Sequence, residues 1–238
     1  MNLLRGDRAV VRIAHRAGAL LEAENSLAAI EASSALGVDA VELDVVPAAD
    51  GRLVLAHGPR VPAEAPSLDE GLDLAARLGL SVQMDVKVRG TERAVADALR
   101  RHELLERSFV SSFSRPILRA FASIEPRLPR SLTYPEDRHG LSDRPLVAPA
   151  VRAGLAGLRT LLPRRLPRWL RSVEASAATL NAAVVTPRAV EVCHGLGVAV
   201  YVWTVNDAAL AISLVATGID GIITDDPRIL PGGSTTRS

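Results

Sequence analysis

The chain has 238 residues, of which 48% are hydrophobic and 23% charged, as expected for a globular protein with a sizeable core. The net charge of +1 argues against a nucleic-acid-binding role driven by phosphate neutralisation, and the single cysteine, Cys193, excludes an internal disulfide. Charges at Arg5, Asp7, Arg8 and Arg12 interrupt the N-terminal residues, and no 18-residue apolar window follows, so we expect neither a signal peptide nor a membrane span, and a cytoplasmic location.

Apolar runs rich in β-formers alternate with helical patterns along the whole chain. The apolar runs predict strands at residues 9–14, 39–45, 81–87, 108–112, 130–134, 179–184, 198–204 and 219–223. The stretches between them predict helices at residues 26–36, 68–78, 91–102, 114–123, 187–196 and 207–216, with Asn25 as a capping signal before the first. Strands that each lead into a helix or loop in this number are typical of an α/β fold of the (β/α)₈, or TIM, barrel type. We therefore expect one such domain over residues 1–230.

Two segments depart from plain alternation. After the second strand, the sequence PAADGRLVLAHG combines an Asp50-Gly51 turn with a further apolar run, which predicts a small extra hairpin strand. After the fifth strand, residues 138–171 are too long for a simple connection and predict an insertion or an extended helix. The last residues, 231–238, have the composition of a disordered tail.

Residues 151–171, VRAGLAGLRTLLPRRLPRWLR, are basic and amphipathic. Their six arginines, several leucines and Trp169 are typical of a helix that rests on a membrane surface, and they predict weak peripheral membrane contact. An outer barrel helix with an arginine-rich solvated face gives the same pattern. The sequence favours the second interpretation and leaves the first open; it carries no signal for the oligomeric state.

Reactive side chains gather where the predicted strands end, which is where the active site of a parallel barrel lies. Carboxylates converging there repel one another unless protons or a cation neutralise them, and oxygen-only ligands suit a hard divalent ion such as Mg²⁺ or Ca²⁺. A buried ion network with arginines would explain the carboxylates without a metal. The strand-end residues are His15, Arg16, Glu42, Asp44, Asp85, Lys87, Trp203, Asn206, Thr224, Asp225 and Asp226, and His57 follows the extra strand.

These residues lie in motifs that resemble the signature of the glycerophosphodiester phosphodiesterase family. The stretch AHRAGALLEAENSLAAIEASSALGVDAVELDVVPAADGRLVLAHG is similar to the family's His-Arg-Gly, Pro-Glu-Asn-Thr, Glu-x-Asp and His-Asp series. Further along, QMDVK resembles its Glu-x-Lys strand, SSF its Ser-Phe segment, and VWTVN with GIDGIITDDP its C-terminal signature. The resemblance extends from Val10 to Pro227, and residues 138–175 are its least similar part.

The resemblance implies a TIM barrel that hydrolyses glycerophosphodiesters, as small-molecule substrates, to glycerol 3-phosphate and an alcohol. It implies a divalent metal, Mg²⁺ or Ca²⁺, and general acid and base catalysis by two histidines. Lys87 is the only lysine of the chain, and it falls where the family places a phosphate-facing lysine. By position, His15 and His57 are the acid and base, Glu42, Asp44 and Asp85 the metal ligands, Arg16, Lys87 and Trp203 the substrate contacts, and Glu24 and Asn25 supporting residues. A tryptophan packed in the core would explain Trp203 equally well.

The chain departs from the family pattern at several positions. Asp85 stands where Glu is usual and is one methylene shorter, and Gly58 replaces an Asp that would orient the preceding histidine. Ala23 replaces a Pro and Ala17 a Gly. The departures leave two alternatives open beside the leading hypothesis: a lysophospholipase-D-like hydrolase acting on lipid at the membrane surface, and a barrel that binds a phosphate ester without turnover.

Overall fold

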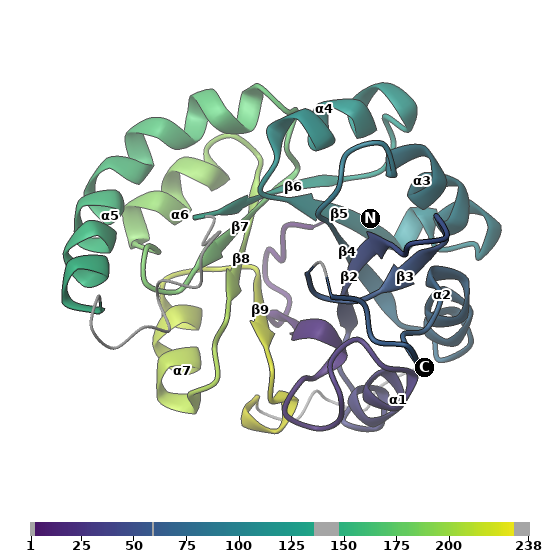
Figure 1. Cartoon of the computed structure of the whole chain (residues 1–238). Coiled ribbons are helices and arrows are strands. Elements are labelled where there is room, and N and C mark those ends of the chain that lie inside the picture. Colours follow the sequence, from purple (N-terminus) through teal and green to yellow (C-terminus); the bar gives the residue numbers. More distant parts are fainter. Residues whose placement is uncertain (1–2, 59, 136–147, 231–238) are drawn as a thin grey trace.

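The computed structural model describes residues 3–58, 60–135 and 148–230, and residues 148–156 by their backbone only. Its centre is a closed barrel of eight parallel strands, in which β1 pairs with both β2 and β9. Helices cover the outside of the barrel (Figure 1). The barrel strands are β1 (Val11–Ala14), β2 (Ala40–Pro47), β4 (Ser81–Val86), β5 (Ser108–Ser112), β6 (Arg130–Tyr134), β7 (Ala177–Asn181), β8 (Ala199–Trp203) and β9 (Gly221–Thr224). The predicted TIM barrel is therefore confirmed.

Helices follow the strands in the predicted order. Serine, threonine or aspartate side chains cap several of them; Ser67, for example, forms a capping box with Glu70 at the start of α2. The α-helices are α1 (Leu27–Ala35), α2 (Leu68–Arg77), α3 (Glu92–Arg101), α4 (Arg115–Ile124), α5 (Ala148–Arg171), α6 (Pro187–His194) and α7 (Ala208–Ala216). Short 3₁₀ turns occur at η1 (His15–Ala17), η2 (Leu105–Arg107) and η4 (Pro227–Ile229).

The extra strand and the long segment after the fifth barrel strand both form as predicted. β3 (Leu53–Leu55) runs antiparallel to the end of β2, with Leu55 opposite Val45. The described part of the segment after β6 is the 24-residue helix α5. Residues 136–147, which contain the start of the predicted insertion, and the predicted tail 231–238 lie outside the described residues.

Two strand boundaries differ from the prediction for a visible reason. β7 ends at Asn181, three residues early, because the Asn181 side chain accepts a hydrogen bond from the Ala183 N–H and turns the chain. β9 begins at Gly221, two residues late, because the Asp220 carboxylate accepts hydrogen bonds from the backbone N–H groups of Arg5 and Val200.

Alternation along each strand divides the side chains between two cores. Val41, Leu43 and Val45 of β2 belong to the large apolar cluster between barrel and helices. A second cluster includes Ala40 from the same strand, together with the stacked rings of Phe109 and Tyr201, whose centroids are 5.3 Å apart. The inward positions of β2 beyond Ala40 are Glu42 and Asp44, so the interior changes from apolar to polar toward the carboxyl ends of the strands.

Candidate active site

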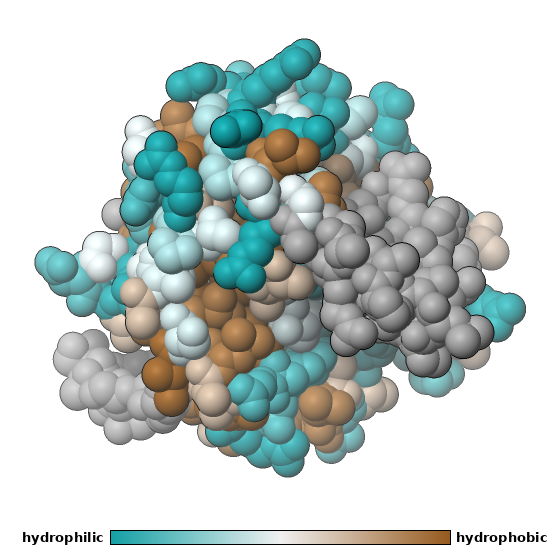
Figure 2. All heavy atoms as spheres, turned by 90° about the vertical axis from the view of Figure 1, so that its left-hand side faces the viewer, coloured by the Kyte–Doolittle hydropathy of each residue, from teal (hydrophilic) through white to brown (hydrophobic). Residues whose placement is uncertain are grey.

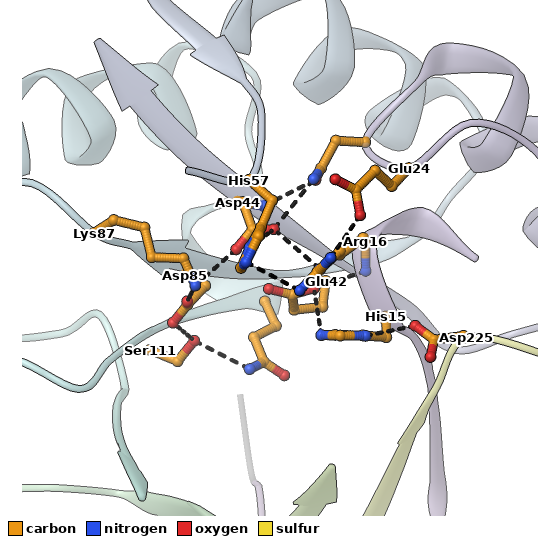
Figure 3. Close-up of polar contacts among 12 residues, drawn as sticks. His15, Arg16, Glu24, Glu42, Asp44, His57, Asp85, Lys87, Ser111 and Asp225 are labelled. Atoms are coloured by element: carbon orange, nitrogen blue, oxygen red, sulfur yellow. Dashed lines mark hydrogen bonds and ion pairs between the residues drawn. The ribbon is translucent and has the colours of Figure 1, made fainter. Parts of the chain in front are cut away.

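Three buried carboxylates meet at the carboxyl end of the barrel (Figure 3). Glu42 and Asp44 come from β2, and Asp85 lies on β4 directly opposite Asp44 in register. They are only 4%, 1% and 4% exposed, and one oxygen from each lies within 4.8 Å of the other two. Three hard oxygen donors in one buried cluster fit the ligand preference of Mg²⁺ or Ca²⁺. The structure thus contains an acidic cluster suited to a divalent metal.

Burial and mutual repulsion make this cluster electrostatically costly. Burial, with the nearby charge of Asp44, raises the pKa of Glu42 to about 8. Burial alone would also raise the pKa of Asp44, but the hydrogen bond from His57 and the charge of Lys87 outweigh it and hold that pKa below its usual range. The cluster is thus stabilised by positive charge, which protein cations supply in part.

Lys87 is one of these cations. Its Nζ lies 2.9 Å from Asp44 Oδ1 and also pairs with Asp85. Burial would lower the pKa of Lys87, but the charges of Asp85 and Asp44 raise it above its ordinary value, so the ammonium stays protonated. The same ammonium lies 5.4 Å from the centroid of the Phe113 ring, within cation–π range.

Arg16 is the second cation, and it projects from η1 immediately after β1. Its backbone has a left-handed φ of 48°, and its N–H donates to Glu42 Oε2 at 2.7 Å. One guanidinium nitrogen donates to Glu24 Oε2 at 2.6 Å, and another lies 3.1 Å from His57 Nε2. Glu24 therefore anchors Arg16 over the cluster.

The two predicted histidines lie on opposite sides of the carboxylates. The β2–β3 hairpin returns His57 to the cluster, where its Nδ1 is 3.0 Å from Asp44 Oδ2. His15 has Nδ1 2.6 Å from Asp225 Oδ1 and Nε2 4.0 Å from Glu42 Oε2. Burial lowers the pKa of His15, but the hydrogen bond with Asp225 and the charges of Glu42 and Asp225 leave it raised overall.

Asn25 supports the cluster and is not the helix cap that its position suggested. Its Nδ2 donates to Asp44 Oδ2 at 3.1 Å, while its Oδ1 accepts the Asp44 N–H at 3.0 Å. Ser26 caps α1 instead, by accepting the N–H of Ala29. The left-handed φ of 59° at Asn25 turns this side chain inward, where it is 1% exposed.

The structure shows what surrounds the two main departures from the family pattern. Asp85 Oδ1 accepts a hydrogen bond of 2.7 Å from Ser111, which in turn accepts one of 3.0 Å from Gln83, so this shorter side chain is held in place. At Gly58 the missing carboxylate is replaced by Asp44, which contacts the preceding histidine directly. Both contacts preserve an orienting partner for a predicted site residue.

Trp203 ends β8 on the other side of the barrel mouth. Its ring packs against the interior cluster and makes an edge contact with Phe113, with centroids 5.7 Å apart. Its Nε1 is buried without a hydrogen-bond partner among the described residues. The ring borders the polar cluster through Phe113, which itself contacts Lys87.

Three residues at the site were given no role from the sequence. Asp225 and Asn206 lay at strand ends within the C-terminal motifs, which gave them no separate role. Asn206 pairs with Asp225 across the neighbouring strands β8 and β9, and Asp225 reaches His15 because β1 closes against β9. Ser111 begins the SSF segment, but the resemblance gave it no role, because its contact with Asp85 crosses to a neighbouring strand.

Comparison with known proteins matches most of the chain to the family that its sequence motifs resemble. Residues 15–108 and 80–229 match the model of the glycerophosphoryl diester phosphodiesterase family. A glycerophosphodiester phosphodiesterase from Caldanaerobacter subterraneus subsp. tengcongensis is 26% identical over 257 aligned positions, which cover 92% of this chain and 95% of that protein.

Solved structures share the fold. An assigned glycerophosphoryl diester phosphodiesterase from Silicibacter pomeroyi DSS-3 superposes with a TM-score of 0.76 at 23% identity, over 96% of this chain and 94% of the other. A phosphodiesterase from Oleispira antarctica, solved with its product sn-glycerol-3-phosphate, superposes with a TM-score of 0.71 at 19% identity, over 91% and 93% of the two chains.

Proposed function

Because the chain belongs to the glycerophosphoryl diester phosphodiesterase family, we propose that it is a metal-dependent phosphoric diester hydrolase that converts glycerophosphodiesters to glycerol 3-phosphate and an alcohol. The observation that carries the proposal is the buried cluster of Glu42, Asp44 and Asp85 between two histidines at the barrel mouth. The Oleispira antarctica phosphodiesterase, which shares this fold, holds sn-glycerol-3-phosphate as its product.

The three carboxylates would hold Mg²⁺ or Ca²⁺, which when bound supplies positive charge to the phosphoryl oxygens. Arg16 and Lys87 flank the cluster and would contact the same phosphate, Arg16 by its planar fork and Lys87 as a point charge. Trp203 and Phe113 form the apolar border of the site and would lie against the glycerol or alcohol part of the substrate.

His15 and His57 would exchange protons with the reacting oxygens. One ring accepts the proton of the attacking oxygen as the new P–O bond forms, and the other gives a proton to the departing alkoxide as the P–O bond to the alcohol breaks. Each ring has Nδ1 against a carboxylate, which leaves Nε2 to exchange the proton; Nε2 of His15 lies 4.0 Å from Glu42 Oε2 of the cluster. For His57, Arg16 contacts Nε2, so the guanidinium must move as it engages a phosphate.

The histidine roles are tested by alanine variants assayed on two phosphodiesters. We expect His15→Ala and His57→Ala each to lower kcat on glycerophosphocholine by about 10²–10⁴-fold. On bis(4-nitrophenyl) phosphate, whose leaving group departs without protonation, the variant lacking the general acid should lose much less activity. The variant that loses less activity on this substrate identifies the histidine that acts as the general acid, and the other histidine is then the general base.

His102→Ala is the matched control, because His102 lies on the outer surface beside Asp69. Its activity should equal that of the wild type. If both site variants keep activity within about threefold of wild type, the acid–base mechanism is wrong. Binding of glycerol 3-phosphate to a wild-type protein that hydrolyses nothing would support the non-catalytic barrel instead.

A second candidate function, hydrolysis of a lipid phosphodiester at a membrane surface, is favoured by the exposed face of α5. Leu162, Leu166 and Leu170 pack into the core, and the opposite face is basic. Within the described part of the chain, the arginines of that face have no ion-pair partner; they are Arg159, Arg164, Arg165, Arg168 and Arg171. Figure 2 views this side, where hydrophilic residues lie above an apolar area. Ile212 of α7, two helices further along the chain, is 68% exposed. Among the described residues, no helix is long and apolar enough to span a membrane.

Liposome co-sedimentation separates this candidate from the first. If α5 binds lipid, the triple variant Arg164→Glu/Arg165→Glu/Arg168→Glu should lose binding to vesicles that contain anionic lipid. The matched control changes Arg93, Arg115 and Arg119 to Glu, which are equally exposed on α3 and α4 and alter the net charge by the same amount. Absence of vesicle binding by the wild type, or equal loss in both variants, would remove the membrane interpretation.

Two further expectations belong to this proposal. We infer that residues 1–230 act as one domain, because the barrel closes between β1 and β9. We also retain the cytoplasmic location; the buried free thiol of Cys193, whose pKa burial raises to about 12, is compatible with it.

A further inference from the structure

A carboxylate from the last barrel strand holds His15. Asp225 follows β9 directly, and its Oδ1 lies 2.6 Å from His15 Nδ1. Because a carboxylate only accepts hydrogen bonds, Nδ1 carries the proton in this contact. The lone pair of the neutral ring is then on Nε2, which lies 4.0 Å from Glu42 Oε2 and faces the carboxylate cluster (Figure 3).

Asp225 is itself fixed from two directions. Its second oxygen accepts a hydrogen bond of 2.6 Å from Asn206 Nδ2, and Asn206 Oδ1 accepts the Asp225 N–H at 2.9 Å. The Leu20 N–H, in the loop after η1, donates to the Asp225 carbonyl at 3.0 Å. The His15 and Asp225 side chains are only 14% and 21% exposed, so little water competes for these bonds.

We propose that Asp225 is the positioning residue of His15 and that Asn206 holds Asp225 in place. Together they fix the Nδ1–H tautomer and aim Nε2 at the reacting oxygen. The inference rests on the proposed function, in which His15 exchanges a proton with that oxygen. His57 has a separate orienting carboxylate, Asp44, so a change at Asp225 affects one histidine and leaves the other and the acidic cluster intact.

The contact between Asp225 and Asn206 can be tested by exchanging the two residue types. In Asp225→Asn, an amide that turns its oxygen to His15 must turn its NH₂ to the NH₂ of Asn206, which sets two donors against each other. An amide in the other orientation presents its NH₂ to His15 Nδ1 and disfavours the Nδ1–H tautomer. In the double variant Asp225→Asn/Asn206→Asp, the carboxylate at position 206 accepts from the new amide, and every hydrogen bond is restored.

We expect Asp225→Asn to lower kcat on glycerophosphocholine by about 100-fold, with KM changed less than about threefold. The kcat of the double variant should be at least about tenfold higher than that of Asp225→Asn. Asp226→Asn is the control, because this neighbouring carboxylate pairs with Arg228 and does not contact His15. Full activity is expected for it.

A second readout does not depend on activity. Nitrogen-15 NMR of the imidazoles, at a pH where the His15 ring is neutral, should show the Nδ1–H tautomer in the wild type and in the double variant, and the Nε2–H tautomer in Asp225→Asn. Retention of kcat within about twofold in Asp225→Asn, no rescue in the double variant, or an unchanged tautomer would each overturn the inference. Absence of phosphodiesterase activity in the wild type would contradict the proposed function, and the tautomers would still decide the role of Asp225.

Discussion

The ammonium of Lys87 makes several contacts at this site. The only lysine of the chain pairs with Asp44 and Asp85 and lies over the Phe113 ring, a position with room for a compact ammonium. We predict that Lys87→Arg, although it keeps the charge, lowers kcat/KM on glycerophosphocholine on the order of 10- to 100-fold, because the broader guanidinium displaces one of its partners.

Arg89→Lys is the control for Lys87→Arg, since it exchanges the same two residue types at an exposed position in the adjacent loop. Steady-state kinetics of both variants gives the comparison. Equal activity of Lys87→Arg and wild type would show that charge alone matters at this position.

Asn25 is a buried residue whose two side-chain hydrogen bonds both end on Asp44. Asn25→Gly keeps the left-handed backbone without strain and removes only the side chain. We predict a free energy of unfolding lower by about 1–3 kcal/mol, because the Asp44 N–H loses its partner. Affinity for Mg²⁺ or Ca²⁺, measured by calorimetry, should fall by about tenfold.

Glu103→Gly is the matched control for Asn25→Gly. Glu103 is also a non-glycine residue with a positive φ, 57°, but it is exposed and far from the site in sequence. Glycine relieves its strain, so the denaturation midpoint should rise or stay unchanged. A similar loss of stability in both variants would mean that backbone freedom, and not the Asp44 contact, explains the effect at Asn25.

At the scale of single elements, the hairpin of β2 and β3 is the clearest success of sequence reasoning. The Asp50-Gly51 turn and the apolar run after it predicted a strand that returns His57 to Glu42 and Asp44, and β3 pairs with the end of β2 in this way. The helix cap was misassigned to Asn25 because its side-chain bond to β2 is a tertiary contact that local capping rules do not include.

Gly221 marks a close approach inside the barrel. A Cβ at this position would lie 2.2 Å from Tyr201 Cδ1 and 3.1 Å from the Val11 carbonyl oxygen. We predict that Gly221→Ala lowers the free energy of unfolding by about 1–3 kcal/mol, because a packed ring and a barrel strand must move. Urea denaturation monitored by tryptophan fluorescence measures this change.

For Gly157→Ala we expect the opposite effect on stability. Gly157 lies in α5 with no atom within 4 Å of an added Cβ, so alanine should raise stability by about 0.5–1 kcal/mol. Equal effects of the two alanine substitutions would contradict the close packing assigned to Gly221.

At the scale of the whole molecule, the order of elements and the carboxylate cluster followed from the sequence. Strand periodicity places Glu42 and Asp44 on one face of β2, and parallel pairing puts Asp85 beside them. The link between His15 and Asp225 did not follow, because 210 residues separate them and only closure of β1 against β9 brings them together. The carboxylates at the ends of consecutive barrel strands were thus predictable, and the contact that depends on ring closure was not.

We propose that the carboxylate cluster binds a metal and that the protein then cleaves glycerophosphodiesters to glycerol 3-phosphate. Phosphorus-31 NMR of glycerophosphocholine, incubated with the protein stripped by EDTA and then supplied with Mg²⁺ or Ca²⁺, measures both parts at once. We predict no turnover without metal and the appearance of glycerol 3-phosphate once one of the two ions is added. Turnover that survives chelation, or no turnover with either ion, would contradict the claim.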